Sequence, residues 1–187
     1  MGGRTSAPRI RPATADDARR IAEIHVRAWH AAYRGLVPDA LLSSLSIDER
    51  EARWRESVTR AETDPRDQVW IAERADTVLG FVLIGPSRDD DASATTGEVY
   101  AIYVEPALVG TGIGRLLFSH AVATLASHGF TRASLWVLEA NAESRRFYAA
   151  AGWRPDGRRK VERQRQFELI EVRYACTLSS ESSSDPR

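Results

Sequence analysis

The chain has 187 residues, of which 43% are hydrophobic and 28% charged, and its 26 basic and 26 acidic side chains give a formal net charge of zero. This length favours one domain over two and is sufficient for a buried core. The balanced charge argues against a nucleic-acid-binding protein, which usually has a clear basic excess, although a local basic patch stays open.

A single cysteine, Cys176, cannot form an internal disulfide or a cysteine-based metal cluster. Its place in a strand-like segment favours a buried structural thiol over a catalytic nucleophile. The sequence has no apolar run of about 18 residues and no apolar segment at its start, so we expect neither a membrane span nor a signal peptide. These features predict a cytoplasmic protein with no membrane partner, built as a single domain over residues 9–178 with flexible tails at 1–8 and 179–187.

Apolar periodicity and turn residues divide the chain into alternating strands and helices. Thr14 and the acidic residues after it are typical of a helix start, as are Ser46 and Glu49 further along. In chain order, the pattern predicts a strand at 9–12, a helix from 14 to about 35, helices beginning at 38 and 46, strands at 68–73, 77–84 and 98–104, a helix at 111–127, a strand at 133–138, a helix at 141–151, and strands at 153–161 and 167–178.

The order of these elements predicts a fold of the α/β class, with a mixed, mostly antiparallel sheet and helices on both faces. The strand at 98–104, the helix at 111–127 and the strand at 133–138 form a crossover unit, whose two strands should be parallel. A tight turn over residues 74–76 should join the two strands before this unit. The helix of the crossover should pack through one apolar stripe, formed by Leu116, Leu117, His120, Ala121 and Leu125.

The strand that ends at Val104 leads into a loop in which Gly110, Gly112 and Gly114 alternate, and a helix begins inside this loop. The first amides of a helix have no intrahelical acceptor, and the helix dipole adds positive potential there. Because glycine lets the backbone approach an oxyanion, the loop can hold a pyrophosphate, although a tight packing turn explains the loop alone equally well. A Walker A loop is excluded, because no Lys-Ser or Lys-Thr pair follows the last glycine, and the third glycine comes one residue early for a dinucleotide fingerprint.

The segment Val104–Gly114 resembles the coenzyme A pyrophosphate loop of the GNAT superfamily of N-acyltransferases. That family has Arg or Gln where this chain has Val109, so the resemblance implies a cradle formed mainly by backbone amides. A second segment, Asn141–Trp153, resembles the family's Asn-x-x-Ala/Ser-x-x-Phe/Leu-Tyr-x-x-x-Gly-Phe/Trp motif at every spacing. Two motifs in this order, with a strand between them, make the resemblance specific over most of the chain, although residues 1–66 match only in their helical organisation.

The resemblance implies a GNAT-like acyl-CoA N-acyltransferase fold and an enzyme that uses acetyl-CoA as co-substrate, without a metal, to acetylate a primary amine by direct attack. Tyr148 would be the general acid at the coenzyme sulfur; a plain core aromatic is the alternative for this residue. Asn141 would contact the pantetheine arm; a helix N-cap is the alternative. The cofactor-binding residues implied by the family also include Ile102, Val104, Val109, Gly110, Thr111, Gly112, Ile113, Gly114 and Arg115.

The attacking amine must lose a proton, and a carboxylate can accept it, often through water. Glu98 is the candidate base, because similar family members carry a carboxylate on this strand. Simple strand alternation places Glu98 on the same face as Tyr100, Ile102 and Val104. A solvated residue at a strand edge is the alternative, and Glu105 is less suited because it lies past the strand end.

In this superfamily the first two helices and the last hairpin usually shape the acceptor groove, which implies Trp29 and Tyr33 as substrate-binding residues; core packing is the alternative. The acidic segment Arg88–Asp91 weakly favours a cationic acceptor such as a polyamine. Basic residues are expected to crowd the turn between the last two strands, where the coenzyme 3′-phosphate, an acidic acceptor, nucleic acid or plain solvent are all open partners: Arg158, Arg159, Lys160, Arg163 and Arg165.

The expected partner is therefore a small-molecule or peptide amine, with no nucleic acid, and a homodimer stays open. A non-catalytic acyl-CoA-binding sensor of the same fold is the alternative function. A dinucleotide-binding oxidoreductase is disfavoured by the glycine spacing.

Overall fold

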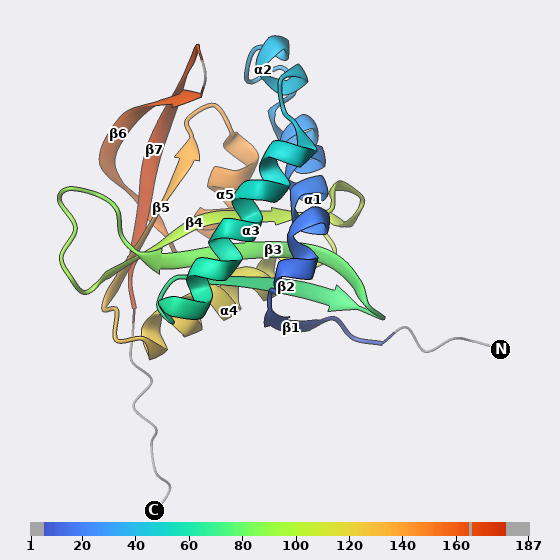
Figure 1. Ribbon diagram of the computed structural model, residues 1–187. Coiled ribbons are helices and arrows are strands. Elements are labelled where there is room, and N and C mark those ends of the chain that lie inside the picture. The colour runs from blue at the N-terminus through green and yellow to red at the C-terminus, as the bar shows by residue number, and fades with distance from the viewer. Residues whose placement is uncertain (1–5, 165, 179–187) are drawn as a thin grey trace, which may run out of the picture.

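The computed structural model describes residues 6–164 and 166–178. The strands in this part of the chain form one seven-stranded sheet, in the order β1-β2-β3-β4-β5-β7-β6 (Figure 1). Neighbouring strands are antiparallel except for β4 and β5, which are parallel, as the predicted crossover requires. The strands are β1 (Arg9–Pro12), β2 (Gln68–Arg74), β3 (Thr77–Pro86), β4 (Thr96–Val104), β5 (Arg132–Leu138), β6 (Arg154–Gln164) and β7 (Phe167–Thr177).

Helices cover both faces of the sheet (Figure 1), which confirms the predicted mixed α/β fold. α1 and α3 bury their apolar side chains against β2 and β3 on one face, whereas α4 and α5 pack on the other face. None of the helices in the described part of the chain is long and apolar enough to cross a membrane. The helices are η1 (Ala15–Asp17), α1 (Ala18–Tyr33), α2 (Asp39–Ser43), α3 (Ile47–Thr63), η2 (Pro106–Leu108), α4 (Ile113–Ser127) and α5 (Ala142–Ala150).

Short-range sequence features explain where several elements begin or turn. The backbone amide of Thr14 donates a hydrogen bond to Asp17 Oδ2 over 2.7 Å and so fixes the turn that precedes α1. Ala75 and Asp76 form the predicted turn between β2 and β3, with φ angles of 46° and 58°. Two successive residues in the left-handed region match the right-handed twist of a hairpin, so this tight turn aligns the two strands.

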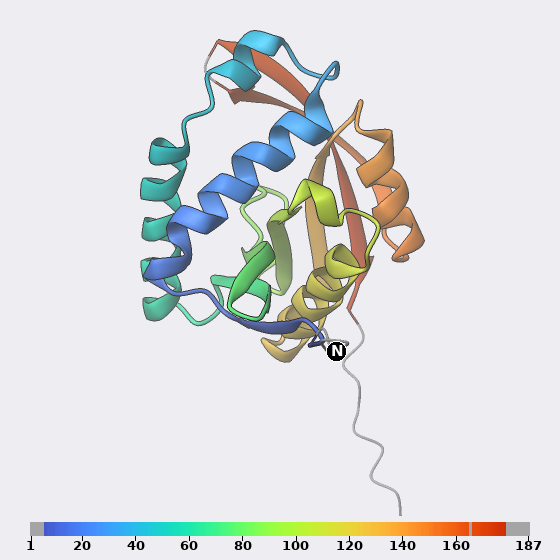
Figure 2. The ribbon, with the colours of Figure 1, turned by 90° about the vertical axis from the view of Figure 1, so that its right-hand side faces the viewer.

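The last hairpin differs from its prediction. β6 extends to Gln164, because its pairing with β7 continues to the partners Gln164 and Phe167. The basic cluster expected in the turn therefore lies within a strand, apart from Arg165, which falls outside the described residues. Figure 2 shows this hairpin next to α2, and Leu41 and Leu169 belong to one small apolar cluster between them.

The apolar stripe of α4 also needs a correction. Leu116 has 37% of its surface exposed, whereas Phe118 has 3% and takes part in the core. The buried arc follows Ile113 and Leu117 at an interval of four residues, so Phe118 lies on its flank while Leu116 faces outward. His120 packs edge-on against Trp70, with ring centroids 4.3 Å apart.

β4 contains a β-bulge at Tyr100. On β3, Ile84 pairs with Val99 and the preceding Leu83 pairs with Ala101, which leaves Tyr100 as an extra residue on β4. A bulge of this kind interrupts the alternation of side chains along a strand. The residues after the bulge therefore point to the opposite faces from those that simple alternation predicts.

The bulge separates Glu98 from the side chains that follow. Ile102 and Val104 pack into the core beneath α4, whereas Tyr100 packs on the side of α1 and α3. Glu98 lies on the same side as Tyr100, because Val99 between them belongs to the core beneath α4. The prediction that Glu98 shares a face with Ile102 and Val104 is therefore wrong.

Candidate functional site

The two parallel strands at the centre of the sheet separate part of the way along. β4 and β5 pair only over Thr96–Val99 and Arg132–Leu135. Beyond this ladder β4 continues beside β3, and β5 continues beside β7. A cavity of about 150 Å³ lies at the resulting opening, lined by the separated parts of β4 and β5 and by residues of α1, α5, β6 and β7.

Tyr148 of α5 borders this cavity. Its side chain is buried, and its ring packs against those of Phe118 and Phe147 at centroid distances of 5.4 and 5.3 Å. Burial raises the pKa of the Tyr148 hydroxyl above its ordinary value, so the hydroxyl keeps its proton at neutral pH. The ring belongs to the core and the residue borders the cavity, so a core aromatic and a general acid are compatible interpretations of Tyr148.

Asn141 lies directly before α5 and lines the same cavity. Its Oδ1 accepts a hydrogen bond from the backbone amide of Ser144 over 3.0 Å, so Asn141 is the N-cap of the helix. The side chain is buried, which fixes its orientation between the helix and the cavity. The N-cap interpretation is confirmed, and a contact between Asn141 and a coenzyme stays a prediction.

Trp29 and Tyr33 lie one turn apart on α1, and the structure brings both to the cavity. Their rings meet edge to face with centroids 4.8 Å apart. The indole nitrogen of Trp29 donates a hydrogen bond to the hydroxyl of Tyr103 over 2.9 Å. Burial raises the pKa of Tyr33 well above its ordinary value. The two residues thus form a rigid aromatic wall on the α1 side of the opening.

Glu98 is not among the described residues that line the cavity. It is buried, and its Oε2 accepts a hydrogen bond from the backbone amide of Arg88 over 2.9 Å. Its Oε1 lies 3.6 Å from the guanidinium of the same arginine. Glu98 therefore anchors the loop that follows β3, and its role as a base stays a prediction. Glu105 pairs with Arg20 and Arg27, both at 2.9 Å.

Two carboxylates that the sequence interpretation missed do line the cavity: Glu162 of β6 and Glu171 of β7. Burial raises the pKa of Glu171, the ammonium of Lys160 lowers it, and the charge of Glu162 raises it again. Alternation along β7 carried the signal for Glu171, since it lies two residues after the buried Leu169 and on the same face.

The loop between β4 and α4 has the geometry of an anion cradle. Gly110 and Gly112 have φ angles of 82° and 93°, in the left-handed region that favours glycine. The first helical hydrogen bond of α4 runs from the amide of Leu116 to the carbonyl of Gly112 over 3.0 Å. The amides of residues 113–115 make no backbone hydrogen bond to any described residue. Free amides at a helix start bind oxyanions, so the loop fits a pyrophosphate.

The other predicted loop residues have distinct places around this cradle. Val109 has 61% of its surface exposed and contributes no polar side chain. The hydroxyl of Thr111 donates a hydrogen bond to the carbonyl of Leu108 over 2.7 Å. Ile113 is buried in the core and so fixes the start of α4. A cradle without a side-chain ligand at position 109 therefore depends on its backbone amides.

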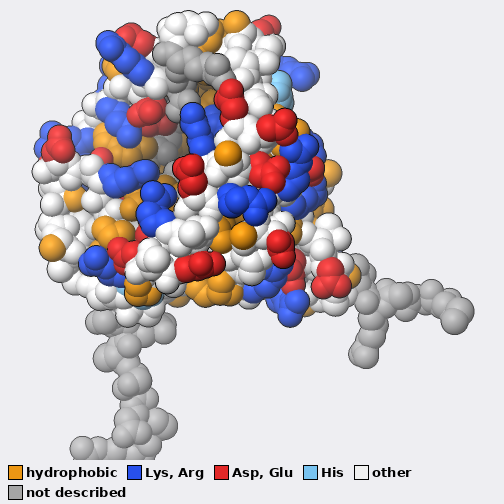
Figure 3. Space-filling view, in the orientation of Figure 1, with side chains coloured by type: hydrophobic (Ala, Val, Ile, Leu, Met, Phe, Trp, Pro, Cys, Tyr) orange, Lys and Arg blue, Asp and Glu red, His pale blue; other side chains and the backbone are white. Residues whose placement is uncertain are grey.

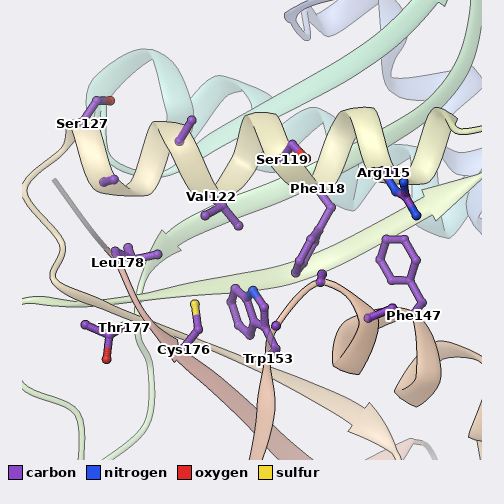
Figure 4. A pocket seen from close by; sticks show the side chains of 15 residues that line it. Arg115, Phe118, Ser119, Val122, Ser127, Phe147, Trp153, Cys176, Thr177 and Leu178 are labelled. Atoms are coloured by element: carbon purple, nitrogen blue, oxygen red, sulfur yellow. The ribbon is translucent and has the colours of Figure 1, made fainter. Parts of the chain in front are cut away.

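A larger groove of about 1110 Å³ runs between α4 and α5 (Figure 4). Arg115 and Phe147 lie at one end of it, close to the glycine loop, whereas Ser127 and Leu178 lie at the other end. Cys176 lines the groove, and burial raises the pKa of its thiol to about 11. The thiol is therefore protonated near neutral pH, which agrees with a structural role.

The acidic loop after β3 is held by ion pairs. The guanidinium of Arg173 lies 2.9 Å from Asp89, 2.6 Å from Asp91 and 2.8 Å from Asp156. This guanidinium holds the pKa of Asp91 well below its ordinary value. The indole nitrogen of Trp136 also donates a hydrogen bond to Asp89 over 2.9 Å. Because Asp89 and Asp91 are paired, the structure gives no support to this loop as a site for a cationic acceptor.

Charges of both signs alternate on the outer surface of α1 and α3. Figure 3 shows basic and acidic side chains interspersed over the face that carries α1 and α3. Arg19 lies 3.6 Å from Glu23, and Arg55 lies 3.0 Å from Glu51. This face thus presents local ion pairs and does not have an electrostatic potential of one sign.

The mixed sheet, its parallel crossover and the amide cradle at the start of α4 agree with the GNAT-like fold that the sequence resemblance implied. Residues 18–153 match the model of the Acetyltransferase (GNAT) family, and the chain belongs to this family. The enzyme class of the family is acetyltransferase.

Individual relatives agree with this assignment. The chain is 32% identical to the uncharacterized N-acetyltransferase YuaI of Bacillus subtilis over 133 residues, which cover 71% of this chain and 72% of the relative. The PaiA N-acetyltransferase of Thermoplasma acidophilum, crystallised with coenzyme A, has a TM-score of 0.70 at 20% identity and covers 89% of this chain and 98% of its own. The putative acetyltransferase YncA of Salmonella typhimurium, crystallised with acetyl-CoA, has a TM-score of 0.67 at 23% identity, with coverages of 97% and 100%.

Proposed function

We propose that this protein transfers the acetyl group of acetyl-CoA to the nitrogen of an amine by direct attack, with no covalent enzyme intermediate. The cavity at the β4–β5 opening carries this proposal, because it places Tyr148, a carboxylate and an aromatic wall around one space. Membership of the GNAT family supports acetyl transfer, and the coenzyme in two similar structures supports acetyl-CoA as donor.

The donor would be held mainly by backbone. The amides of residues 113–115 would bind its pyrophosphate, since they have no backbone partner among the described residues, whereas the amide of Thr111 donates to the carbonyl of Leu108 over 3.2 Å. Beyond Val99, the edge of β4 no longer pairs with β5. Backbone groups of Ile102 and Val104 there would bind the amides of the pantetheine arm, with Asn141 beside them. The thioester then reaches the cavity through the sheet.

Tyr148 would act on the leaving group. Its hydroxyl carries a proton at neutral pH, because burial raises its pKa. As the C–N bond forms and the C–S bond breaks, this hydroxyl can donate its proton to the sulfur and so prevent the release of a bare thiolate. The product is then an amide and free coenzyme A thiol.

Two carboxylates are candidates for the proton of the attacking amine. Glu98 lies on the strand where a base is expected, but it is engaged by Arg88. Glu171 lines the cavity, and its raised pKa makes it a better proton acceptor near neutral pH than an ordinary glutamate. A base must reach the amine directly or through one water, so the proposal favours Glu171.

Trp29 and Tyr33 would form the wall against which the acceptor lies. Both line the cavity from the α1 side, opposite the helices that flank the donor. The acceptor would be a small-molecule or peptide amine that enters from this side.

The proposal is tested by calorimetry with acetyl-CoA and by thiol release over a panel of amines that includes amino acids, aminoglycosides, alkylamines and peptide N-termini. We expect saturable acetyl-CoA binding and thiol release with at least one amine class. Binding with no turnover across the panel would favour a non-catalytic acyl-CoA sensor. Absence of binding would contradict both functions.

A further inference from the structure

Lys160 is the only lysine in the chain; every other basic side chain apart from the four histidines is an arginine. It lies on β6, beside the cavity at the β4–β5 opening. Its ammonium lies 4.4 Å from the ring centroid of Trp136, 3.5 Å from a carboxylate oxygen of Glu171 and 3.8 Å from one of Glu162. An alkylammonium of this same chain is thus held by an indole face and two carboxylates.

The three partners of this ammonium all line the cavity. Trp136, Glu162 and Glu171 come from three different strands, yet they border the same space as Tyr148 and Trp29. The face of an indole ring attracts cations, and nearby carboxylates add charge and hydrogen-bond acceptors. The cavity therefore contains a built receptor for an ammonium group within the volume that an acceptor has to enter.

A second cation, the guanidinium of Arg173, lies 5.7 Å from the ring centroid of Trp136, but it is paired with Asp89, Asp91 and Asp156. Glu162 and Glu171 face the ammonium of Lys160, and burial together with the like charge of Glu162 raises the pKa of Glu171. An additional cation would lower this repulsion, whereas an anionic group would increase it. The adjoining walls formed by Trp29, Tyr33 and Leu169 are apolar, which suits an alkyl chain between two polar ends.

We propose that Trp136 and Glu162 form an ammonium subsite of the acceptor cavity next to the candidate base Glu171, that Lys160 occupies this subsite before the acceptor binds, and that the acceptor is a diamine whose second ammonium takes the place of that of Lys160. This inference rests on the proposed acetyl transfer, which supplies the reaction at the first amine. The ammonium of Lys160 then competes with the second ammonium of the acceptor for this subsite. This competition determines which amines bind in a position where they can react.

The test compares 1,4-diaminobutane with butylamine, which has the same carbon chain and only one amine, in the wild-type protein and in Lys160→Met. Methionine keeps a long unbranched side chain over Trp136 but removes the charge. We expect the wild type to prefer the diamine, and the ratio of diamine to monoamine kcat/KM to rise by roughly tenfold in Lys160→Met. Glu162→Gln should lower the same ratio.

Arg163→Met is the matched control, because it removes another cation from β6 whose partner, Glu168, lies at 3.3 Å outside the cavity. This control should leave the ratio unchanged. A ratio that is unchanged or lower in Lys160→Met, or unaffected by Glu162→Gln, would overturn the inference. If both amines release thiol with equal efficiency in every variant, only the diamine subsite fails, whereas the absence of thiol release with any amine would count against the proposed function itself.

Discussion

The indole nitrogen of Trp54 in α3 donates a hydrogen bond to Nδ1 of His25 in α1 over 3.0 Å. His25 also stacks on the ring of Tyr103, with centroids 4.8 Å apart and ring planes within 18° of parallel. Burial, together with the nearby charge of Arg50, lowers the pKa of His25 to about 3. This histidine is therefore a neutral part of the core that joins the two helices to β4.

The low pKa of His25 predicts that the protein loses stability in mild acid. Its ordinary pKa of 6.5 applies to the unfolded chain, so only the unfolded state gains this proton between pH 6.5 and about 3. Stability should fall as the pH drops below 6.5, by about 1.4 kcal/mol per pH unit from this group, and should not depend on it above. Urea denaturation between about pH 5 and 6.5 should show a flatter slope for His25→Gln, and equal slopes would contradict the assignment.

The glycine cradle can be tested with two alanine variants of the same backbone strain. Gly112 and Gly129 have φ angles of 93° and 83°, and a Cβ at either would meet no atom within 4 Å. Each alanine should destabilise the protein by about 1–2 kcal/mol, because both residues are in the left-handed region. Only Gly112→Ala should also raise the Kd for acetyl-CoA in calorimetry, by roughly tenfold. A similar loss of affinity in Gly129→Ala would mean that the effect is one of general stability.

Loss of the Tyr148 hydroxyl should slow the chemical step. Tyr148→Phe keeps the aromatic packing against Phe118, so we expect a nearly unchanged melting temperature and acetyl-CoA affinity. Its kcat should fall by about 100-fold, the usual range for a lost general acid. Tyr174→Phe is the control, since Tyr174 is also buried but its hydroxyl contacts Arg145 outside the cavity. A normal kcat in Tyr148→Phe would remove this residue from the mechanism.

The two candidate bases give opposite expectations. Glu171→Gln should lower kcat/KM by about 100-fold and remove the acidic limb of its pH profile, because the proton acceptor in the cavity is lost. Glu98→Gln should keep most of the activity and lower the melting temperature, since it weakens the attachment of Arg88. Steady-state kinetics over a pH series distinguishes the two. The reverse pattern would return the base role to Glu98.

Arg173 should be among the costliest surface-proximal residues to replace. Its side chain has 9% of its surface exposed, and its guanidinium contacts three aspartates. Arg173→Met should destabilise the protein by about 3–5 kcal/mol, because it leaves partly buried carboxylates without a counter-ion. Arg159→Met, which breaks an exposed pair with Glu139, should leave the midpoint of chemical denaturation nearly unchanged. Similar losses in chemical denaturation of both variants would contradict this account.

Local patterns in the sequence predicted much of the framework. The tight turn at residues 74–76 and the caps at Thr14 and Asn141 depend on neighbours in the chain, so local sequence patterns could predict them, although not the positive φ angles of Ala75 and Asp76. The glycine loop is similar, since its conformation and free amides follow from Gly110 and Gly112. These features needed no knowledge of distant contacts.

The features that sequence reasoning missed depend on long-range register. The bulge at Tyr100 arises from the pairing of β4 with β3, and no residue type in β4 indicates in the sequence that a bulge occurs there. Alternation along β7 indicates the face on which Glu171 lies, but that this face borders the cavity depends on the place of β7 between β5 and β6, an order that local periodicity does not contain. The extra length of β6 follows from the same pairing. Assignments that assumed regular alternation, above all that of Glu98, were therefore the ones that failed.

The short ladder between β4 and β5 is also the weak connection between two groups of strands in the sheet. Only four residue pairs join the strands β1 to β4 to the strands β5, β7 and β6. Elsewhere along this seam, the two half-sheets are linked by side-chain packing and by the bonds of Asp89 and Asp91 to Trp136 and Arg173. Opening the seam would expose both halves without breaking the ladders within them, so their amide protons should exchange with deuterium as two separate groups. The proposed passage for the substrate thus coincides with the boundary at which we expect the two groups of strands to separate.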